Sequence, residues 1–135
     1  MLPAILLVDD DPITNFVNER LLRRLRVSEE VLVALNGQLG LDLLAERCGQ
    51  GSRGCPTLVL LDLKMPVMNG FEFLEAVMRL PLSRHHSIVV VLLTSTQLDR
   101  DLSRLQHLPV TDYLTKPLTG EKVTRLLSQY FRPEN

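Results

Sequence analysis

Residues 4–12 read Ala-Ile-Leu-Leu-Val-Asp-Asp-Asp-Pro, an apolar run that ends in three acids and a proline. A short apolar run bounded by polar residues is typical of a strand that is buried on both faces. Asp11 and Pro12 have the order of a helix N-cap and first helical residue, because an acid accepts a free N–H and proline lacks the N–H that the first turn leaves unbonded. The stretch therefore predicts a buried strand followed directly by a helix.

The same order of strand and helix recurs along the rest of the chain. Further strands are predicted at residues 31–35, 58–61, 88–93 and 112–114, and the run at 88–93, the most hydrophobic, is expected at the centre of the sheet. Helices are predicted at 12–25, from Asn36, at 71–80, around 98–108 and at 119–131. Alternation with short connections predicts an α/β fold, a parallel sheet with helices on both faces.

Finer local features are predicted from spacing and from turn residues. The apolar residues of the first helix are expected to face inward; they are Ile13, Phe16, Val17, Leu21 and Leu25. Asn69-Gly70 predicts a turn with the glycine in an unusual backbone conformation. Cys48 and Cys55 bound a glycine-rich stretch, where we expect two reduced thiols in a mobile loop, although a disulfide is sterically possible.

Size and charge limit the classes of function. The chain has 135 residues, 45% of them apolar, and a net charge of −1, which suits one domain over residues 1–135 and gives no sign of a nucleic-acid partner. The longest apolar runs are far shorter than the ~20 residues that span a bilayer. No basic segment followed by an apolar segment opens the chain, so we expect a cytoplasmic protein without a membrane partner.

Polar groups follow four of the five predicted strands. These groups are Asp9-Asp10-Asp11, Asp62, Thr94-Ser95-Thr96 and Lys116-Pro117. The carboxyl ends of parallel strands meet at one edge of a sheet, where such folds bind ligands. Clustered carboxylates repel one another unless a cation neutralises them, and oxygen ligands suit Mg²⁺ (or Mn²⁺). A carboxylate, a hard cation, a hydroxyl and an ammonium together suit phosphoryl transfer.

Four stretches of the sequence carry a resemblance to a known family: Leu7-Val8-Asp9-Asp10, Leu61-Asp62-Leu63-Lys64-Met65-Pro66-Val67-Met68-Asn69-Gly70, Leu93-Thr94-Ser95 and Tyr113-Leu114-Thr115-Lys116-Pro117. They resemble the receiver domains of two-component response regulators, of the chemotaxis-regulator type, over nearly the whole chain. The resemblance implies a flavodoxin-like, doubly wound sheet of strand order 2-1-3-4-5. Because no further predicted element follows the last helix, we expect a stand-alone receiver with no output domain.

The resemblance also implies a role for each acid. Asp62 would be the phosphoacceptor, and Asp10 and Asp62 would bind Mg²⁺ together with the backbone carbonyl of Lys64. Asp9 would support the metal through water. Asp11, the third acid of the run, is more simply the cap of the first helix.

The remaining site residues are implied in the same way. Thr94 would donate a hydrogen bond to a phosphoryl oxygen, and Lys116 would pair with another. A cis peptide before Pro117 would direct the lysine. Tyr113 would be the aromatic switch residue that moves inward when Thr94 shifts toward the phosphoryl group.

The implied activity is a phosphorelay step rather than enzymatic turnover of other substrates. The phosphoryl group would come from a histidine kinase or a histidine phosphotransfer protein. A downstream protein, unknown from sequence, would bind the surface formed by residues 98–108, strand 112–114 and the last helix, on a monomer or weak dimer. The arginines of the first helix are either a solvated face or a docking face for the phosphodonor; they are Arg20, Arg23, Arg24 and Arg26.

Lys64 and Thr96 are expected to set the lifetime of the phosphoryl group. By the resemblance, the residues two beyond Asp62 and two beyond Thr94 flank the path of the attacking water. A long ammonium side chain would obstruct that path, and a threonine offers no carboxylate or amide to orient the water. We therefore expect slow hydrolysis.

Three other functions fit the sequence less well. A haloacid-dehalogenase-type phosphatase would need a further acidic pair after Lys116, and it would leave Asp62 unexplained. A flavodoxin is disfavoured because aromatics are 4% of the residues and tryptophan is absent. A degenerate receiver that acts as a scaffold is disfavoured by the complete set of acids, threonine and lysine.

Overall fold

The computed structural model describes residues 1–48, 54–62, 68–80, 88–94 and 108–131. The described elements are β1 (Leu2–Val8), α1 (Pro12–Leu25), β2 (Ser28–Ala34), α2 (Gly37–Arg47), β3 (Leu58–Asp62), α3 (Gly70–Arg79), β4 (Val89–Thr94), β5 (Asp112–Thr115) and α5 (Gly120–Tyr130). The helix predicted around 98–108 falls almost entirely outside the described residues. Each other predicted element is found, with its ends moved by a few residues.

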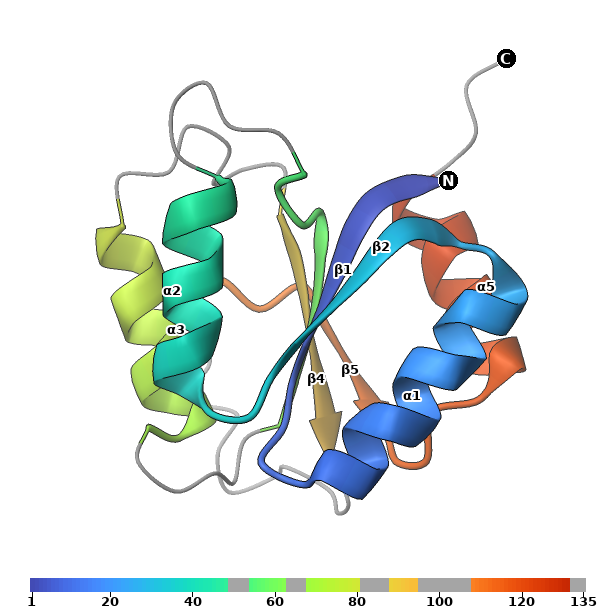
Figure 1. Cartoon of the computed structure of the whole chain (residues 1–135), viewed down its shortest axis with the longest axis horizontal. Helices are drawn as coiled ribbons and strands as arrows, with labels where there is room; N and C mark the ends of the chain where they lie inside the picture. Colours follow the sequence, from blue (N-terminus) through green and yellow to red (C-terminus); the bar gives the residue numbers. More distant parts are fainter. Residues whose placement is uncertain (49–53, 63–67, 81–87, 95–107, 132–135) are drawn as a thin grey trace.

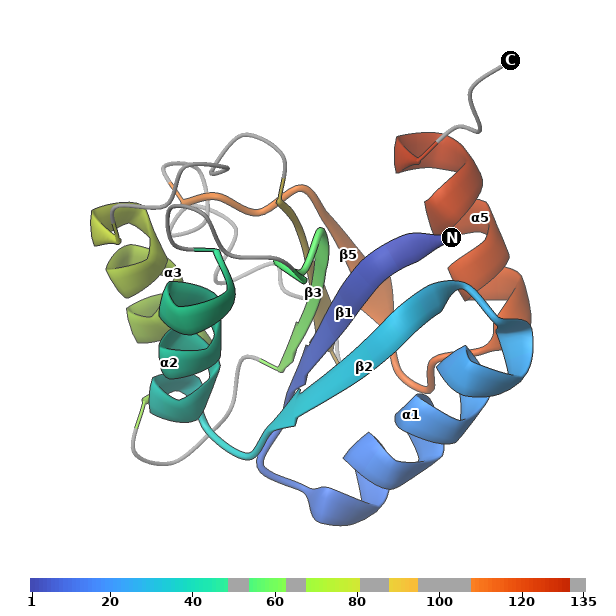
Figure 2. The same cartoon turned by 45° about the horizontal axis from the view of Figure 1, so that its top comes forward.

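The strands form one parallel sheet of order β2-β1-β3-β4-β5, which confirms the predicted fold. Helices α2 and α3 cover one face of this sheet, and α1 and α5 cover the other (Figure 1). The view in Figure 2 shows the same two layers from another side. The central strand is β3, so the prediction that residues 88–93 hold the centre was wrong by one strand.

Alternating side chains of the inner strands feed two separate hydrophobic cores. In β1, Leu6 and Val8 point to the core under α2 and α3, whereas Ile5 and Leu7 point to the core under α1 and α5. β3 and β4 divide their residues in the same way. Because successive residues of a strand face opposite sides, a strand covered on both faces must be apolar throughout. This requirement explains the unbroken runs in the sequence.

The inward face of α1 differs from the predicted one. Ile13, Phe16 and Val17 are 72%, 58% and 56% exposed, while Leu21 and Leu25 are partly buried. The residues that α1 buries are Asn15, Asn18 and Leu22. The first turns of α1 lie beside the polar carboxyl ends of the strands, where the Asn15 side chain donates a hydrogen bond to the Asp9 carbonyl at 2.8 Å. The amphipathic pattern therefore indicated the wrong face for these turns.

Asn69-Gly70 begins a helix and does not form a glycine turn. Asn69 caps α3 by accepting from the N–H of Glu72, and the Glu72 side chain accepts from the N–H of Asn69. Gly70 does not have a positive φ, unlike Gly54 at 78°. The prediction of an unusual glycine conformation was wrong because a reciprocal capping box supplies the bend.

Cys48 and Cys55 form a disulfide, which corrects the expectation of two reduced thiols in a mobile loop. Cys48 is the C-cap of α2, its N–H donating to the Leu44 carbonyl, and both cysteines are buried in the core under α2 and α3. Their Cα atoms lie 4.6 Å apart, within the usual range for a disulfide. The helix end and the lead-in to β3 bring the two cysteines together, which spacing alone does not reveal.

None of the described helices has the length and apolar character needed to cross a bilayer.

Candidate functional site

The predicted site residues converge at one edge of the sheet. Asp9 follows β1, Asp62 and Thr94 are the last residues of β3 and β4, and Lys116 follows β5. The parallel register places them there, since Thr94 pairs with Thr115 and the Lys116 N–H donates to the Thr94 carbonyl at 2.6 Å. The convergence that was expected from the strand ends is confirmed.

Three carboxylates form a cluster at this edge. One oxygen from each of Asp9, Asp10 and Asp62 lies within 4.8 Å of the others. Asp9 is buried, Asp62 is partly buried and Asp10 is exposed, so the cluster is closed on one side and open to solvent on the other. Hard divalent cations take oxygen ligands in such a setting.

Lys116 is the cation that the structure places against these acids. Its Nζ lies 3.2 Å from Asp9 Oδ2 and 3.6 Å from Asp62 Oδ1. Partial burial lowers the pKa of Lys116, but the carboxylates of Asp62 and Asp9 raise that pKa, and the net shift is upward from the usual lysine value. Lys116 is therefore an ammonium at neutral pH. Three carboxylates against this one ammonium leave negative charge within the described site, which fits a divalent cation.

The loop between β1 and α1 is held by its own polar groups. Asp9 Oδ1 accepts from the Asp11 N–H at 3.0 Å, and the Asp9 carbonyl accepts from Asn15. Asp11 points to α1, where the hydroxyl of Thr14 and the N–H of Ile13 lower the pKa of its carboxyl. The predicted capping role of Asp11 is confirmed. Sequence reasoning missed Asn15. Its place in the first turns of the helix, four positions after the cap Asp11, is the signal that could have found it.

Thr94 and Tyr113 lie on neighbouring strands and differ in exposure. Thr94 is 8% exposed at the end of β4, and the neighbouring strand β5 carries Tyr113, which is 44% exposed. The threonine is therefore buried and the tyrosine on the neighbouring strand is exposed. Lys64 and Thr96 lie outside the described residues.

The loop after β5 contains a second lysine contact that the sequence did not suggest. The predicted cis peptide joins Lys116 to Pro117. Lys122, in the first turn of α5, donates to the carbonyls of Thr115 and Pro117 at 2.6 and 3.0 Å. In the sequence, a lysine five residues after a lysine-proline pair does not by itself indicate this contact.

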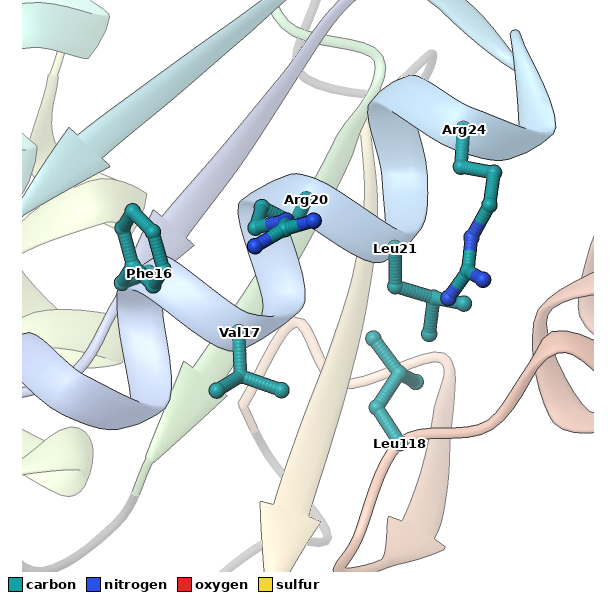
Figure 3. Close-up of a pocket in the computed structure, with 6 residues that line it drawn as sticks. All are labelled: Phe16, Val17, Arg20, Leu21, Arg24 and Leu118. Carbon is teal, nitrogen blue, oxygen red and sulfur yellow. The ribbon is translucent and has the colours of Figure 1, made fainter.

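A groove of about 440 Å³ lies beside this edge, between α1 and the loop that leads to α5. Figure 3 shows Leu21 of α1 and Leu118 of the loop pointing toward one another, with Val17 next to them and the Arg24 guanidinium alongside. The guanidinium of Arg20 lies 5.9 Å from the centre of the Phe16 ring. The groove is therefore apolar with two arginines at its margin.

Residues 5–128 match the family model of the response regulator receiver domain. The chain belongs to the response-regulator receiver family. This receiver is 35% identical over 125 residues to the probable methanogenesis regulatory protein FilR2 of Methanothrix harundinacea, covering 93% of the chain and 79% of that protein.

Solved structures give the same assignment. The receiver has a TM-score of 0.82 and 27% identity to a two-component response regulator from Cytophaga hutchinsonii, covering 96% of this chain and 97% of that one. It has a TM-score of 0.77 and 32% identity to the bacteriophytochrome response regulator AtBRR, covering 100% of this chain and 96% of that one. The receiver thus belongs to two-component signalling.

Proposed function

We propose that Asp62 of this receiver accepts a phosphoryl group from a phosphohistidine of a kinase or phosphotransfer protein, in a reaction that needs Mg²⁺ or Mn²⁺. The observation that carries the proposal is the meeting of Asp62 with two further carboxylates and the Lys116 ammonium at one edge. The chain acts as a switch in the cytoplasm and does not turn over other substrates.

The proposed reaction is a single group transfer. A carboxylate oxygen of Asp62 bonds to phosphorus, and the bond from phosphorus to the donor's imidazole nitrogen breaks. The imidazole keeps the electron pair and takes up a proton. Lys116, already within reach of both Asp9 and Asp62, pairs with a phosphoryl oxygen, and the Thr94 hydroxyl donates to another. Charge placed in advance around the transferring group is the main source of catalysis in phosphoryl transfer.

The residues present fit a divalent cation. Asp9, Asp10 and Asp62 supply the carboxylates, and the backbone carbonyl of Lys64 is proposed as a further ligand. A bound Mg²⁺ supplies positive charge to the phosphoryl oxygens. It also relieves the repulsion among the three acids.

The signal would leave through the face that carries Tyr113. Movement of Thr94 toward the phosphoryl group opens space into which the exposed tyrosine can turn. The downstream partner would bind the surface of residues 98–108, β5 and α5, and the receiver would act as a monomer or weak dimer.

The direct test is incubation with acetyl phosphate and Mg²⁺, followed by intact-mass measurement. We expect one added phosphoryl group, which a chelator prevents. No uptake at any metal concentration would overturn the proposal. Turnover of a generic phosphoester would instead favour a phosphatase.

We propose that the groove beside α1 receives an amphipathic helix of the phosphodonor with acidic residues at its margins. The groove borders the phosphoacceptor edge through Leu118, two residues after Lys116. The arginines Arg20 and Arg24 complement negative charge, and the apolar floor accepts an apolar side chain. The proposal also gives the exposed Phe16 and Val17 a role as contact residues, since exposed apolar surface is typical of interaction sites.

The docking proposal predicts a loss specific to the protein donor. With Arg20→Glu and Arg24→Glu together, transfer from a phosphotransfer protein that serves the wild type should fall about a hundredfold, roughly 2.7 kcal/mol, because two attractions become repulsions. Rates are measured with labelled donor, and uptake from acetyl phosphate should stay unchanged. The control carries Arg79→Glu and Arg125→Glu, with the same net charge but on α3 and α5. Equal losses in the two variants would show that the effect comes from overall charge, and would contradict the docking proposal.

The phosphoryl lifetime is a further prediction and concerns Lys64 and Thr96. Lys64→Asn with Thr96→Glu should speed loss of the phosphoryl group about tenfold, ~1.4 kcal/mol in the barrier, because the path of water is opened and a carboxylate can orient it. The decay of the purified phosphoprotein in Mg²⁺ is followed by mass. A double variant that decays no faster than wild type would show that the lifetime is set elsewhere.

A further inference from the structure

The ammonium of Lys122 contacts the peptide groups on both sides of Lys116. Its Nζ lies 2.6 Å from the carbonyl oxygen of Thr115 and 3.0 Å from that of Pro117, with the Thr115 hydroxyl at 3.4 Å. Three donors on one ammonium thus meet three oxygens of one short loop. Lys116 is the residue between the two carbonyls.

The placement of Lys122 is unusual for a helix. Thr119 caps α5 and accepts from the Lys122 N–H, so Lys122 is in the first turn. A cation there opposes the helix dipole by about 0.3–1 kcal/mol. The carbonyl contacts offset this cost and indicate that the charge serves the loop and not the helix.

We propose that Lys122 is a positioning residue for Lys116, an inference that rests on the proposed phosphoryl transfer. α5 is a fixed mount because Val123 and Leu126 are buried in the core that it shares with the sheet. From this helix Lys122 holds the two carbonyls in place. The fixed loop in turn determines the backbone position of Lys116. The Lys116 ammonium is then already positioned 3.2 Å from Asp9 and 3.6 Å from Asp62, and it need not rearrange before transfer.

The effect is indirect, since the Lys122 ammonium is directed at backbone oxygens. A small displacement of a group that contacts the reacting atoms is costly, up to ~100-fold for 1 Å. Lys122→Met keeps most of the side-chain length and loses all three hydrogen bonds. We expect uptake from acetyl phosphate to slow about tenfold in Lys122→Met, because a loosened loop retains part of the geometry. Lys122→Arg, which can still donate to both carbonyls, should restore most of the rate.

Arg125→Met is the matched control. Arg125 lies on the same helix and is 77% exposed in its side chain, and its described ion pair is with Glu121 at 3.5 Å. The substitution removes one positive charge from α5 and none of the loop contacts. A loss in Arg125→Met as large as that in Lys122→Met would overturn the proposal.

Two further measurements decide the question. In a Lys116→Met background, Lys122→Met should slow uptake no further, because the residue through which it acts is gone; an undiminished tenfold effect there would overturn the proposal. Hydrogen exchange of the Lys116 N–H, bonded to the Thr94 carbonyl, should be faster in Lys122→Met than in wild type and Arg125→Met. Unchanged exchange also overturns it. Exchange needs no phosphorylation, so a wild type that takes up no phosphoryl group would remove the proposed function while exchange still decides the role of Lys122.

Discussion

With Asp62→Asn, we expect no phosphoryl group on the protein after incubation with acetyl phosphate and Mg²⁺, whereas the wild type gains one. The amide is neutral, and its oxygen is a far weaker nucleophile than the carboxylate oxygen that attacks phosphorus. The rate should therefore fall by at least a thousandfold, ~4 kcal/mol in the barrier. Because Asp62 is the last residue of β3, we expect the substitution to leave the strand and its register in place.

Asp11→Asn is the control for this experiment. Asp11 belongs to the same acidic region of the sequence but caps α1, and asparagine also caps helices well. Its uptake should equal that of wild type. A full adduct in Asp62→Asn would show that another residue is the nucleophile.

Millimolar Mg²⁺ should raise the melting temperature of the wild type. A ligand at about a hundred times its Kd stabilises the native state by about 2.7 kcal/mol, which is roughly 10 °C in Tm for a domain of this size. With Asp10→Ala, one of the three carboxylates is lost and most of this rise should disappear. Asp10 is exposed, so the substitution itself costs little packing.

The metal-free protein supplies an internal check. There Asp10→Ala should melt no lower than wild type, because it removes one of three acids that repel one another. Glu75→Ala, an exposed acid on α3, should keep the full response to Mg²⁺. No rise in wild type, or an equal rise in Asp10→Ala, would count against this metal site.

The strands and their polar ends could be predicted from sequence because each depends on local pattern. A strand buried on both faces must be apolar throughout, and the parallel order brings Asp62, Thr94 and Lys116 to one edge. These features need no knowledge of distant contacts.

The features that could not be predicted depend on what an element packs against. α1 buries Asn15 because the Asp9 carbonyl lies there, and it leaves Phe16 exposed. The disulfide of Cys48 and Cys55 depends on where α2 ends relative to β3. Lys122 acquires its role from a loop that curves back over the helix start.

β5 and α5 are fastened to each other at both ends. Lys122 joins the start of α5 to the end of β5, and the Tyr130 hydroxyl joins the end of α5 to Asp112 at the start of β5, at 2.9 Å. Burial and the nearby Asp112 carboxylate raise the pKa of Tyr130, so its hydroxyl keeps its proton to donate. Hydrogen bonds at both ends thus tie the helix to the strand, with Lys116 next to one of the two ties. Under the proposed phosphorylation, a displacement of Lys116 toward the phosphoryl group would move β5 and α5 together. A partner bound to α5 would then meet a changed orientation of that helix.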